Sequence, residues 1–253
     1  MIELTLFIFG SCIGSFLNVC IYRLPLSKSI VFPPSACPGC DTPIQFYDNI
    51  PILSFLLLRG KCRHCQSVIS LRYPLIELMS GLFAVCTYLK FGLTLEALIA
   101  YLLIASLIVI TFIDIDHRII PDAISLPGIP IGFAASFFLP AISYKASLAG
   151  VLVGGGSLLA VAWIYSLITK KEGMGGGDIK LLAMIGAFIG WKGVLLTIFF
   201  SSAIGTLCGL LVMIRSGKNM KLAIPFGPFL AIGCMIHIFF GNTIIFWYFH
   251  TFS

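Results

Sequence analysis

Two aspartates stand where apolar runs meet polar sequence. Asp114 closes one long apolar run, and Asp178 follows the glycine-rich stretch 173–177 and opens another. An ionisable side chain at membrane depth is unfavourable, so it marks a functional site by default. Two carboxyl groups held together can share a proton, which lets one act as a base and the other as an acid. These residues therefore predict aspartyl-protease chemistry at Asp114 and Asp178.

Four cysteines form a second candidate site, in the most polar part of the chain. Cys37 and Cys40 make one Cys-x-x-Cys pair, and Cys62 and Cys65 make another, with residues 41–61 between the pairs. Two such pairs supply four thiolates for a tetrahedral zinc ion. Four protein ligands leave no position for a reactive water, so the predicted role of zinc is structural. A redox dithiol and unligated thiols are the alternative interpretations.

The composition indicates a membrane protein. Of the 253 residues, 59% are hydrophobic and 10% are charged, and the mean hydropathy is +1.06, whereas a soluble domain carries about 25% charged residues. Eight apolar runs are candidate membrane helices: 2–22, 74–91, 95–114, 122–140, 146–169, 178–191, 193–215 and 225–249. Pro127 and Pro130 lie in the fourth run, where we expect a kink or a break.

Positive charge predicts the orientation of these helices. Lysines and arginines accumulate in cytoplasmic loops. If residue 1 lies outside, all but three of the 16 lysines and arginines fall in cytoplasmic segments, and the exceptions are Lys90, Lys145 and Lys192. This orientation places segment 23–73 and both aspartates on the cytoplasmic side. The net charge of +6 is therefore an orientation signal, and it requires no nucleic-acid partner.

The predicted fold is an all-α polytopic membrane protein of about eight transmembrane helices. A small zinc-binding cytoplasmic domain lies between the first two helices. We expect residues 1–22 to form transmembrane helix 1 and residues 23–73 to form the zinc-binding domain. Residues 74–253 then form a transmembrane aspartyl protease domain with helices 2–8. Pairs such as Gly10 and Gly14, or Gly186 and Gly190, predict close helix packing.

Three further acidic residues are interpreted from their local sequence. Glu77, one turn inside the second predicted helix, either pairs with Arg72 or belongs to a second site. Asp122 follows a proline and favours the positive end of a helix. Asp116 is either solvated or paired with Arg118.

Several longer motifs occur in a fixed order along the chain. They are Gly14–Pro25, the paired cysteines, Asn49–Pro51, Leu58–Gly60, Ile69–Glu77, Asp114–Asp116, Ile120–Asp122, Gly175–Leu181 and Ile224–Phe229. In this series the sequence resembles the bacterial type IV prepilin peptidases, a family of bifunctional leader peptidases and N-methyltransferases that serve type IV pili and type II secretion. The resemblance covers nearly the whole chain.

The resemblance implies a protease of the Gly-x-Gly-Asp type in the bacterial inner membrane, with Asp114 and Asp178 as its catalytic pair. Its substrates would be type IV prepilins and type II secretion pseudopilins, cut on the cytoplasmic side behind a short basic leader. The new N-terminal residue would then be methylated with S-adenosylmethionine as the methyl donor. Gly60 matches a family position associated with methylation, and Glu77 is a further candidate for the cofactor site. The partners are these substrates and membrane lipid.

The residues alone are also compatible with two other classes of function. A transporter also uses intramembrane acids at interrupted helices as proton relays, and proton-dependent uptake without peptide cleavage would support it. A membrane scaffold could bind pilins without chemistry, and it would tolerate neutralisation of both acids.

Overall fold

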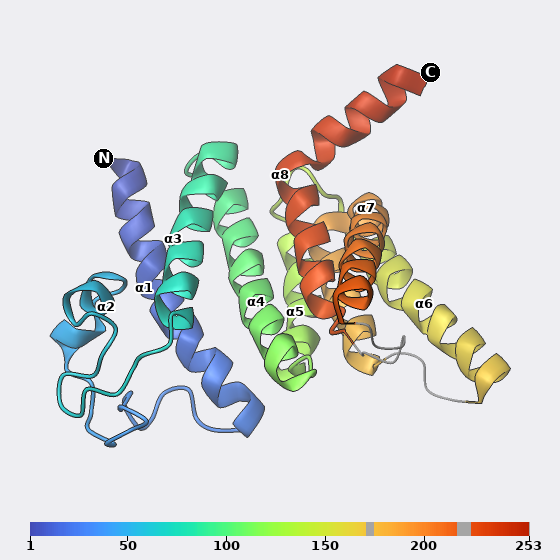
Figure 1. The fold of residues 1–253 in the computed structure, drawn as a ribbon. Helices are drawn as coiled ribbons and strands as arrows, with labels where there is room; N and C mark the ends of the chain where they lie inside the picture. Colours follow the sequence, from blue (N-terminus) through green and yellow to red (C-terminus); the bar gives the residue numbers. More distant parts are fainter. Residues whose placement is uncertain (171–174, 217–223, 253) are drawn as a thin grey trace. The chain divides into compact units, whose positions relative to one another are not determined.

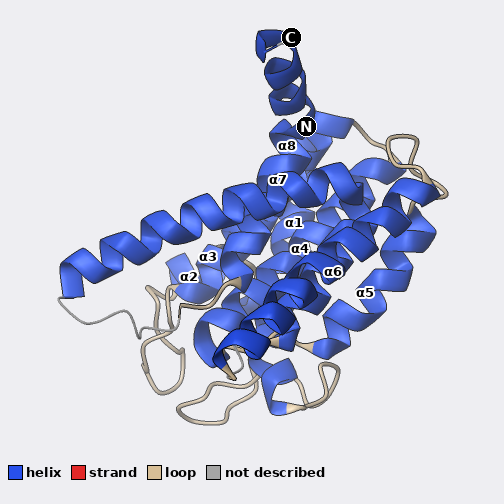
Figure 2. Ribbon diagram, turned by 90° about the vertical axis from the view of Figure 1, so that its right-hand side faces the viewer, coloured by secondary structure: helices blue, strands red, loops and turns tan. Residues whose placement is uncertain are grey.

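The chain folds into helices joined by short loops. The computed structural model describes residues 1–170, 175–216 and 224–252. Its elements are α1 (Ile2–Arg23), η1 (Leu24–Leu26), η2 (Phe46–Asn49), α2 (Leu53–Leu57), α3 (Arg72–Phe91), α4 (Leu95–His117), α5 (Asp122–Ala135), α6 (Tyr144–Thr169), α7 (Gly176–Ser216) and α8 (Gly227–Phe252) (Figure 1). Within these described ranges there are helices and loops but no strands (Figure 2), so the predicted all-α class is confirmed.

Six of the described helices are long and apolar enough to cross a membrane: α1, α3, α4, α6, α7 and α8. α5 is apolar but has only 14 residues, so it ends earlier than the predicted run 122–140. The predicted runs 178–191 and 193–215 correspond to the two parts of α7. The backbone of α7 leaves the helical conformation at Gly190, where φ is 69° and ψ is 175°. Glycine adopts this positive φ without a steric penalty, so Gly190 marks a bend.

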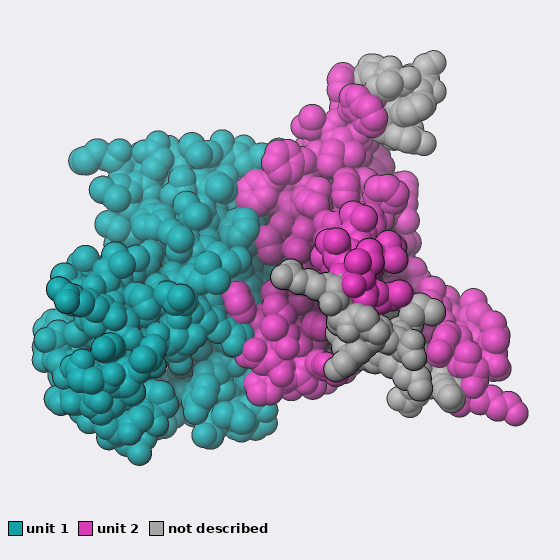
Figure 3. Space-filling view, in the orientation of Figure 1, with its two compact units in different colours: residues 1–109 teal, residues 110–253 magenta. Residues whose placement is uncertain are grey.

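The described residues form two compact units, Met1–Val109 and Ile110–Ser253 (Figure 3). The boundary falls inside α4. The first unit contains the four paired cysteines, and the second contains both candidate catalytic aspartates.

In the first unit, α1 packs closely against α3. A side-chain carbon added at Gly10 would lie 2.7 Å from Cβ of Ala84, and one added at Gly14 would lie 2.7 Å from Cα of Glu77. The hydroxyl of Ser80 donates a hydrogen bond of 2.7 Å to the carbonyl of Gly10. The predicted glycine contact is therefore confirmed at Gly10 and Gly14, where small residues let two backbones approach.

In the second unit, α7 is the central helix and contacts α5, α6 and α8. Its contact with α6 depends on glycine, because a carbon added at Gly154 would lie 2.5 Å from the carbonyl oxygen of Leu182. The hydroxyl of Ser147 on α6 also donates a hydrogen bond of 2.7 Å to the carbonyl of Ala187 on α7. The first part of α7, which carries Asp178, is thereby fixed against α6.

This packing predicts opposite effects for two alanine substitutions in one glycine triplet. Gly154→Ala should lower the free energy of unfolding by roughly 1–3 kcal/mol, because the added methyl group meets rigid backbone. Gly156→Ala is the matched control, because nothing lies within 4 Å of a carbon added there, and alanine favours the helix. Thermal unfolding of the purified protein in detergent measures both. Equal melting temperatures for the two variants would contradict the close contact of α6 and α7.

Candidate active site

Asp114 lies in the last turn of α4 and is only 5% exposed. Its Oδ2 accepts a hydrogen bond of 3.0 Å from the backbone N–H of Gly227, the first residue of α8. A side-chain carbon at Gly227 would lie 2.6 Å from this same oxygen, so the contact requires glycine. The partial positive charge of a helix N-terminus also favours a neighbouring carboxylate. The start of α8 therefore holds Asp114 in place.

Asp178 lies in the first turn of α7 and is partly buried. The backbone at Gly177 passes close to the loop between α4 and α5, because a carbon added at Gly177 would lie 3.0 Å from Cβ of Ile120. Residues 171–174, which include Gly173 of the predicted glycine-rich stretch, lie outside the described residues. The described glycines thus bring Asp178 next to the loop that follows Asp114.

A cavity of about 240 Å³ joins these parts of the second unit. Asp114 and Asp178 both line it. The other lining residues are Arg118, Ile119, Ile120, Asp122, Gly175, Gly177 and Lys180. The structure therefore brings the two predicted aspartates to one polar cavity, with glycine backbone on one wall.

The cavity also contains an ion pair that the sequence pattern did not predict. Nζ of Lys180 lies 2.7 and 2.8 Å from the two carboxylate oxygens of Asp122. Asp122 is the first residue of α5, so the prediction that it begins a helix is confirmed. Its partner is 58 positions away in the chain, and no spacing rule links them. Asp116, in contrast, is exposed and does not line the cavity.

The paired cysteines of the first unit occupy two turns of the same geometry. In the first turn, the N–H of Cys37 donates to the carbonyl of Thr42 at 3.0 Å, and the N–H of Asp41 donates back to the carbonyl of Cys37 at 2.8 Å. Cys62 repeats this pattern with Ser67 and Gln66, at 2.9 and 3.1 Å. The residue after each second cysteine has a positive φ, 53° at Asp41 and 60° at Gln66. The two halves of the site are thus structural repeats.

The four sulfur atoms fit a metal ion. All four Sγ atoms lie within 4.8 Å of one another, and those of Cys37 and Cys65 are 3.7 Å apart. Four sulfurs placed tetrahedrally at 2.3 Å from zinc would be about 3.8 Å apart. Hydrogen bonds from the Ser67 hydroxyl and the Gly39 N–H lower the pKa of the Cys37 thiol to about 6, and the thiolate is the form that binds metals. This cluster could therefore hold a metal ion.

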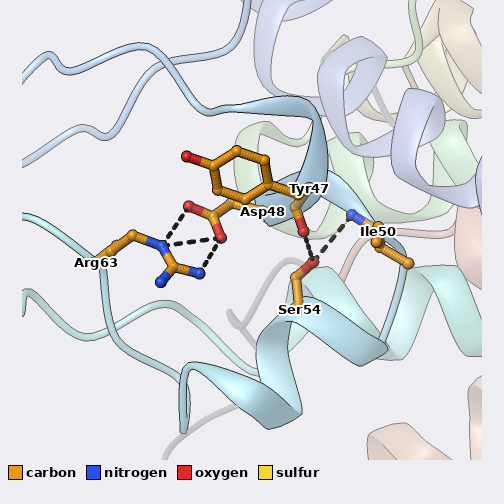
Figure 4. A network of polar contacts seen from close by, with 5 residues as sticks. All are labelled: Tyr47, Asp48, Ile50, Ser54 and Arg63. Carbon is orange, nitrogen blue, oxygen red and sulfur yellow. Dashed lines mark hydrogen bonds and ion pairs between the residues drawn. The ribbon is translucent and has the colours of Figure 1, made fainter.

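A network of polar contacts joins the second cysteine turn to η2 and α2 (Figure 4). The guanidinium of Arg63 binds both carboxylate oxygens of Asp48, with Nη2 at 2.6 Å and Nε at 2.9 Å. This guanidinium holds the pKa of the Asp48 carboxyl below its usual value. The hydroxyl of Ser54 on α2 donates to the carbonyl of Tyr47 at 3.0 Å and accepts from the N–H of Ile50 at 2.9 Å.

Gly60 is buried between α2 and the second cysteine turn. Its φ is 68°, and a carbon added to it would lie 3.0 Å from Cζ of Phe55. Its N–H donates to the carbonyl of Phe55 at 2.9 Å, and its carbonyl accepts from Ile69 at 2.7 Å. Both the conformation and the space at this position require glycine.

Glu77 is 8% exposed, and its Oε2 accepts a hydrogen bond of 2.7 Å from the N–H of Ile52. Ile52, the residue before α2, has a φ of 62°, which is a strained conformation for a β-branched side chain. The bond to Glu77 helps to hold it. The structure thus shows a partner for Glu77 that the sequence pattern did not indicate.

Comparison with known proteins finds relatives over nearly the whole chain. Residues 8–91 match the family described as Bacterial Peptidase A24 N-terminal domain, and residues 101–210 match the Type IV leader peptidase family. Proteins named prepilin leader peptidase/N-methyltransferase from Pseudomonas putida, Stutzerimonas stutzeri and Aeromonas hydrophila are 37%, 38% and 36% identical to it. The alignments cover 94%, 94% and 96% of this chain and 90%, 90% and 92% of those proteins. No solved structure matches the chain significantly.

The cysteine geometry predicts the metal content of the protein. The purified protein should carry one zinc ion per chain, bound by four thiolates. Cys37→Ser and Cys62→Ser should each remove most of this metal, because a hydroxyl is a much weaker ligand. Cys12→Ser is the control, since Cys12 lies on α1 outside the cluster. Elemental analysis by mass spectrometry gives the ratio, and metal-free wild-type protein would contradict the prediction.

Proposed function

Because the chain belongs to the type IV leader peptidase family, we propose that it cleaves the leader of type IV prepilins and pseudopilins with Asp114 and Asp178. The observation that supports this proposal is the shared cavity. The two aspartates come from helices far apart in the sequence, and both line the same cavity of about 240 Å³. Family membership and the relatives' names support both leader cleavage and N-methylation.

The two carboxyl groups divide acid and base roles between them. One is ionised and removes a proton from water, whose oxygen attacks the scissile carbonyl carbon. The other is protonated and donates to the carbonyl oxygen or to the leaving nitrogen. The C–N bond then breaks, which gives the leader a new carboxylate and the mature protein a new amine. The pair titrates as a unit.

The remaining cavity residues position the substrate. Gly175 and Gly177 have no side chains, so an extended peptide backbone can lie against this wall. The hydrogen bond from Gly227 to Oδ2 of Asp114 leaves Oδ1 to face the water or the peptide. The ion pair of Lys180 with Asp122 holds the start of α7 against the start of α5. It thereby helps to position Asp178 at the cavity.

Methylation is assigned to the polar domain, residues 23–73. S-adenosylmethionine, when bound, would supply a methyl group to the new N-terminal amine, which would lose a proton, and S-adenosylhomocysteine would be released. We propose a donor site near Gly60 and Glu77, because Gly60 matches a family position associated with methylation and Glu77 binds the backbone directly before α2. The four-cysteine centre is a structural zinc site that holds the two cysteine turns together.

The orientation follows from the charge distribution. The chain is a multi-pass protein of the bacterial inner membrane, with the zinc domain and both aspartates on the cytoplasmic side. The chain has three functional segments: helix 1 (residues 1–22), the zinc domain (23–73) and the protease domain (74–253). The apolar part of the substrate lies among the membrane helices while its leader remains in the cytoplasm.

Loss of either catalytic carboxyl group should abolish leader cleavage. Asp114→Asn and Asp178→Asn should each lower the rate by at least about 10²–10⁴-fold, the usual contribution of a general acid or base. Asp116→Asn, at the same end of α4 but outside the cavity, should retain most of the activity. Intact-mass measurement of a purified prepilin gives the cleaved fraction. Normal cleavage by a stably folded Asp114→Asn or Asp178→Asn protein would disprove the assignment.

A bulky residue at Gly60 should separate the two activities. Gly60→Leu forces a side chain into a positive-φ position against the ring of Phe55, so it distorts the polar domain and leaves the aspartate cavity unchanged. Methyl transfer should fall at least several-fold more than leader cleavage, and the same mass spectra report both. Gly156→Leu is the control for leucine at an open glycine. Equal loss of both activities in Gly60→Leu would contradict two separate sites.

A further inference from the structure

The short helix α2 exposes its three leucines and buries its one polar residue. Leu53, Leu56 and Leu57 are 49%, 64% and 73% exposed, whereas Ser54 is only 7% exposed. Figure 4 shows the Ser54 hydroxyl directed at the backbone of η2. On the adjoining η2, Phe46 is 85% exposed. A helix surrounded by water has the opposite pattern.

A hydrogen bond ties the start of α2 to α3, near the beginning of that helix. The N–H of Ile52, directly before α2, binds the carboxylate of Glu77 at 2.7 Å. Glu77 is five residues beyond Arg72, where α3 begins, and this corresponds to about 7.5 Å along a helix. α3 is one of the helices long and apolar enough to cross a membrane. In Figure 1, α2 lies beside the first turns of α3.

The charges around α2 complement an anionic surface. Arg59 and Lys61 directly follow the helix and are exposed, and residues 53–61 contain no acidic side chain. Amphipathic helices of membrane interfaces place their apolar face about 5–10 Å into the boundary between headgroups and acyl chains, with basic residues at the headgroups. The distance of Glu77 from the first residue of α3 is of the same size.

We propose that the α2 face, formed by Phe46, Leu53, Leu56 and Leu57, inserts into the interface of an anionic lipid bilayer, with Arg59 and Lys61 against the headgroups. The polar domain then lies on the membrane surface and not free in water. The contacts of Ser54 with η2, and of Asp48 on η2 with Arg63, hold the four-cysteine centre at this surface.

Site-specific photo-cross-linking of the full-length protein in vesicles tests this proposal. Benzoylphenylalanine replaces Leu57 in one variant. A second variant carries it at Leu82, which lies within the span of α3 and is 50% exposed. A third carries it at His64, which is exposed on the second cysteine turn. The vesicles contain phosphatidylglycerol and phosphatidylethanolamine, and mass spectrometry identifies the adducts.

We expect lipid adducts at Leu57 in a yield comparable to Leu82 and several-fold higher than at His64. Replacing the vesicle lipids with phosphatidylcholine should lower the yield at Leu57 and leave that at Leu82 unchanged. No adduct at Leu57 would overturn the proposal, as would equal yields at Leu57 and His64. A Leu57 adduct of twice the chain mass would show that a second copy of the protein covers α2, and it would also overturn the proposal.

Discussion

A carboxyl group at the end of an apolar helix has to be held by polar partners, and the second unit is built around that constraint. Asp114 is almost completely buried and is held by the first N–H of α8. Asp178 enters the same cavity from the first turn of α7. Close glycine contacts fix α7 against α6, and the Lys180 ion pair ties it to α5. The helices of this unit therefore act together to keep two acids at one cavity.

In the first unit, a series of polar contacts connects the cysteine turns to a membrane helix. Arg63 ties the second cysteine turn to η2, Ser54 ties η2 to α2, and Glu77 ties the start of α2 to α3. A domain of about 50 residues has too small an apolar core to be stable by itself. A metal ion at the four cysteines would add to its stability, and the hydrogen bond from Ile52 to Glu77 anchors it to α3.

Residue type and local spacing predicted the parts of the structure that depend on nearby sequence. The cysteine cluster followed from two Cys-x-x-Cys pairs, and Asp114 and Asp178 followed from charge within apolar sequence. The contacts of Gly227 with Asp114 and of Ile52 with Glu77 were not predicted, because they join residues 113 and 25 positions apart. Hydropathy also could not distinguish two helices from one bent helix at Gly190, since the bend is a property of backbone geometry.

The shared catalytic cavity is tested most directly by asking whether positions 114 and 178 face each other in the membrane-inserted protein. Cysteines are placed at both positions, a short bifunctional thiol reagent is added, and mass spectrometry identifies the linked peptides among those from native cysteines. We expect a link between positions 114 and 178, and none between 116 and 178, because Asp116 lies outside the cavity. A folded protein that links 116 but not 114 to position 178 would contradict the shared catalytic cavity.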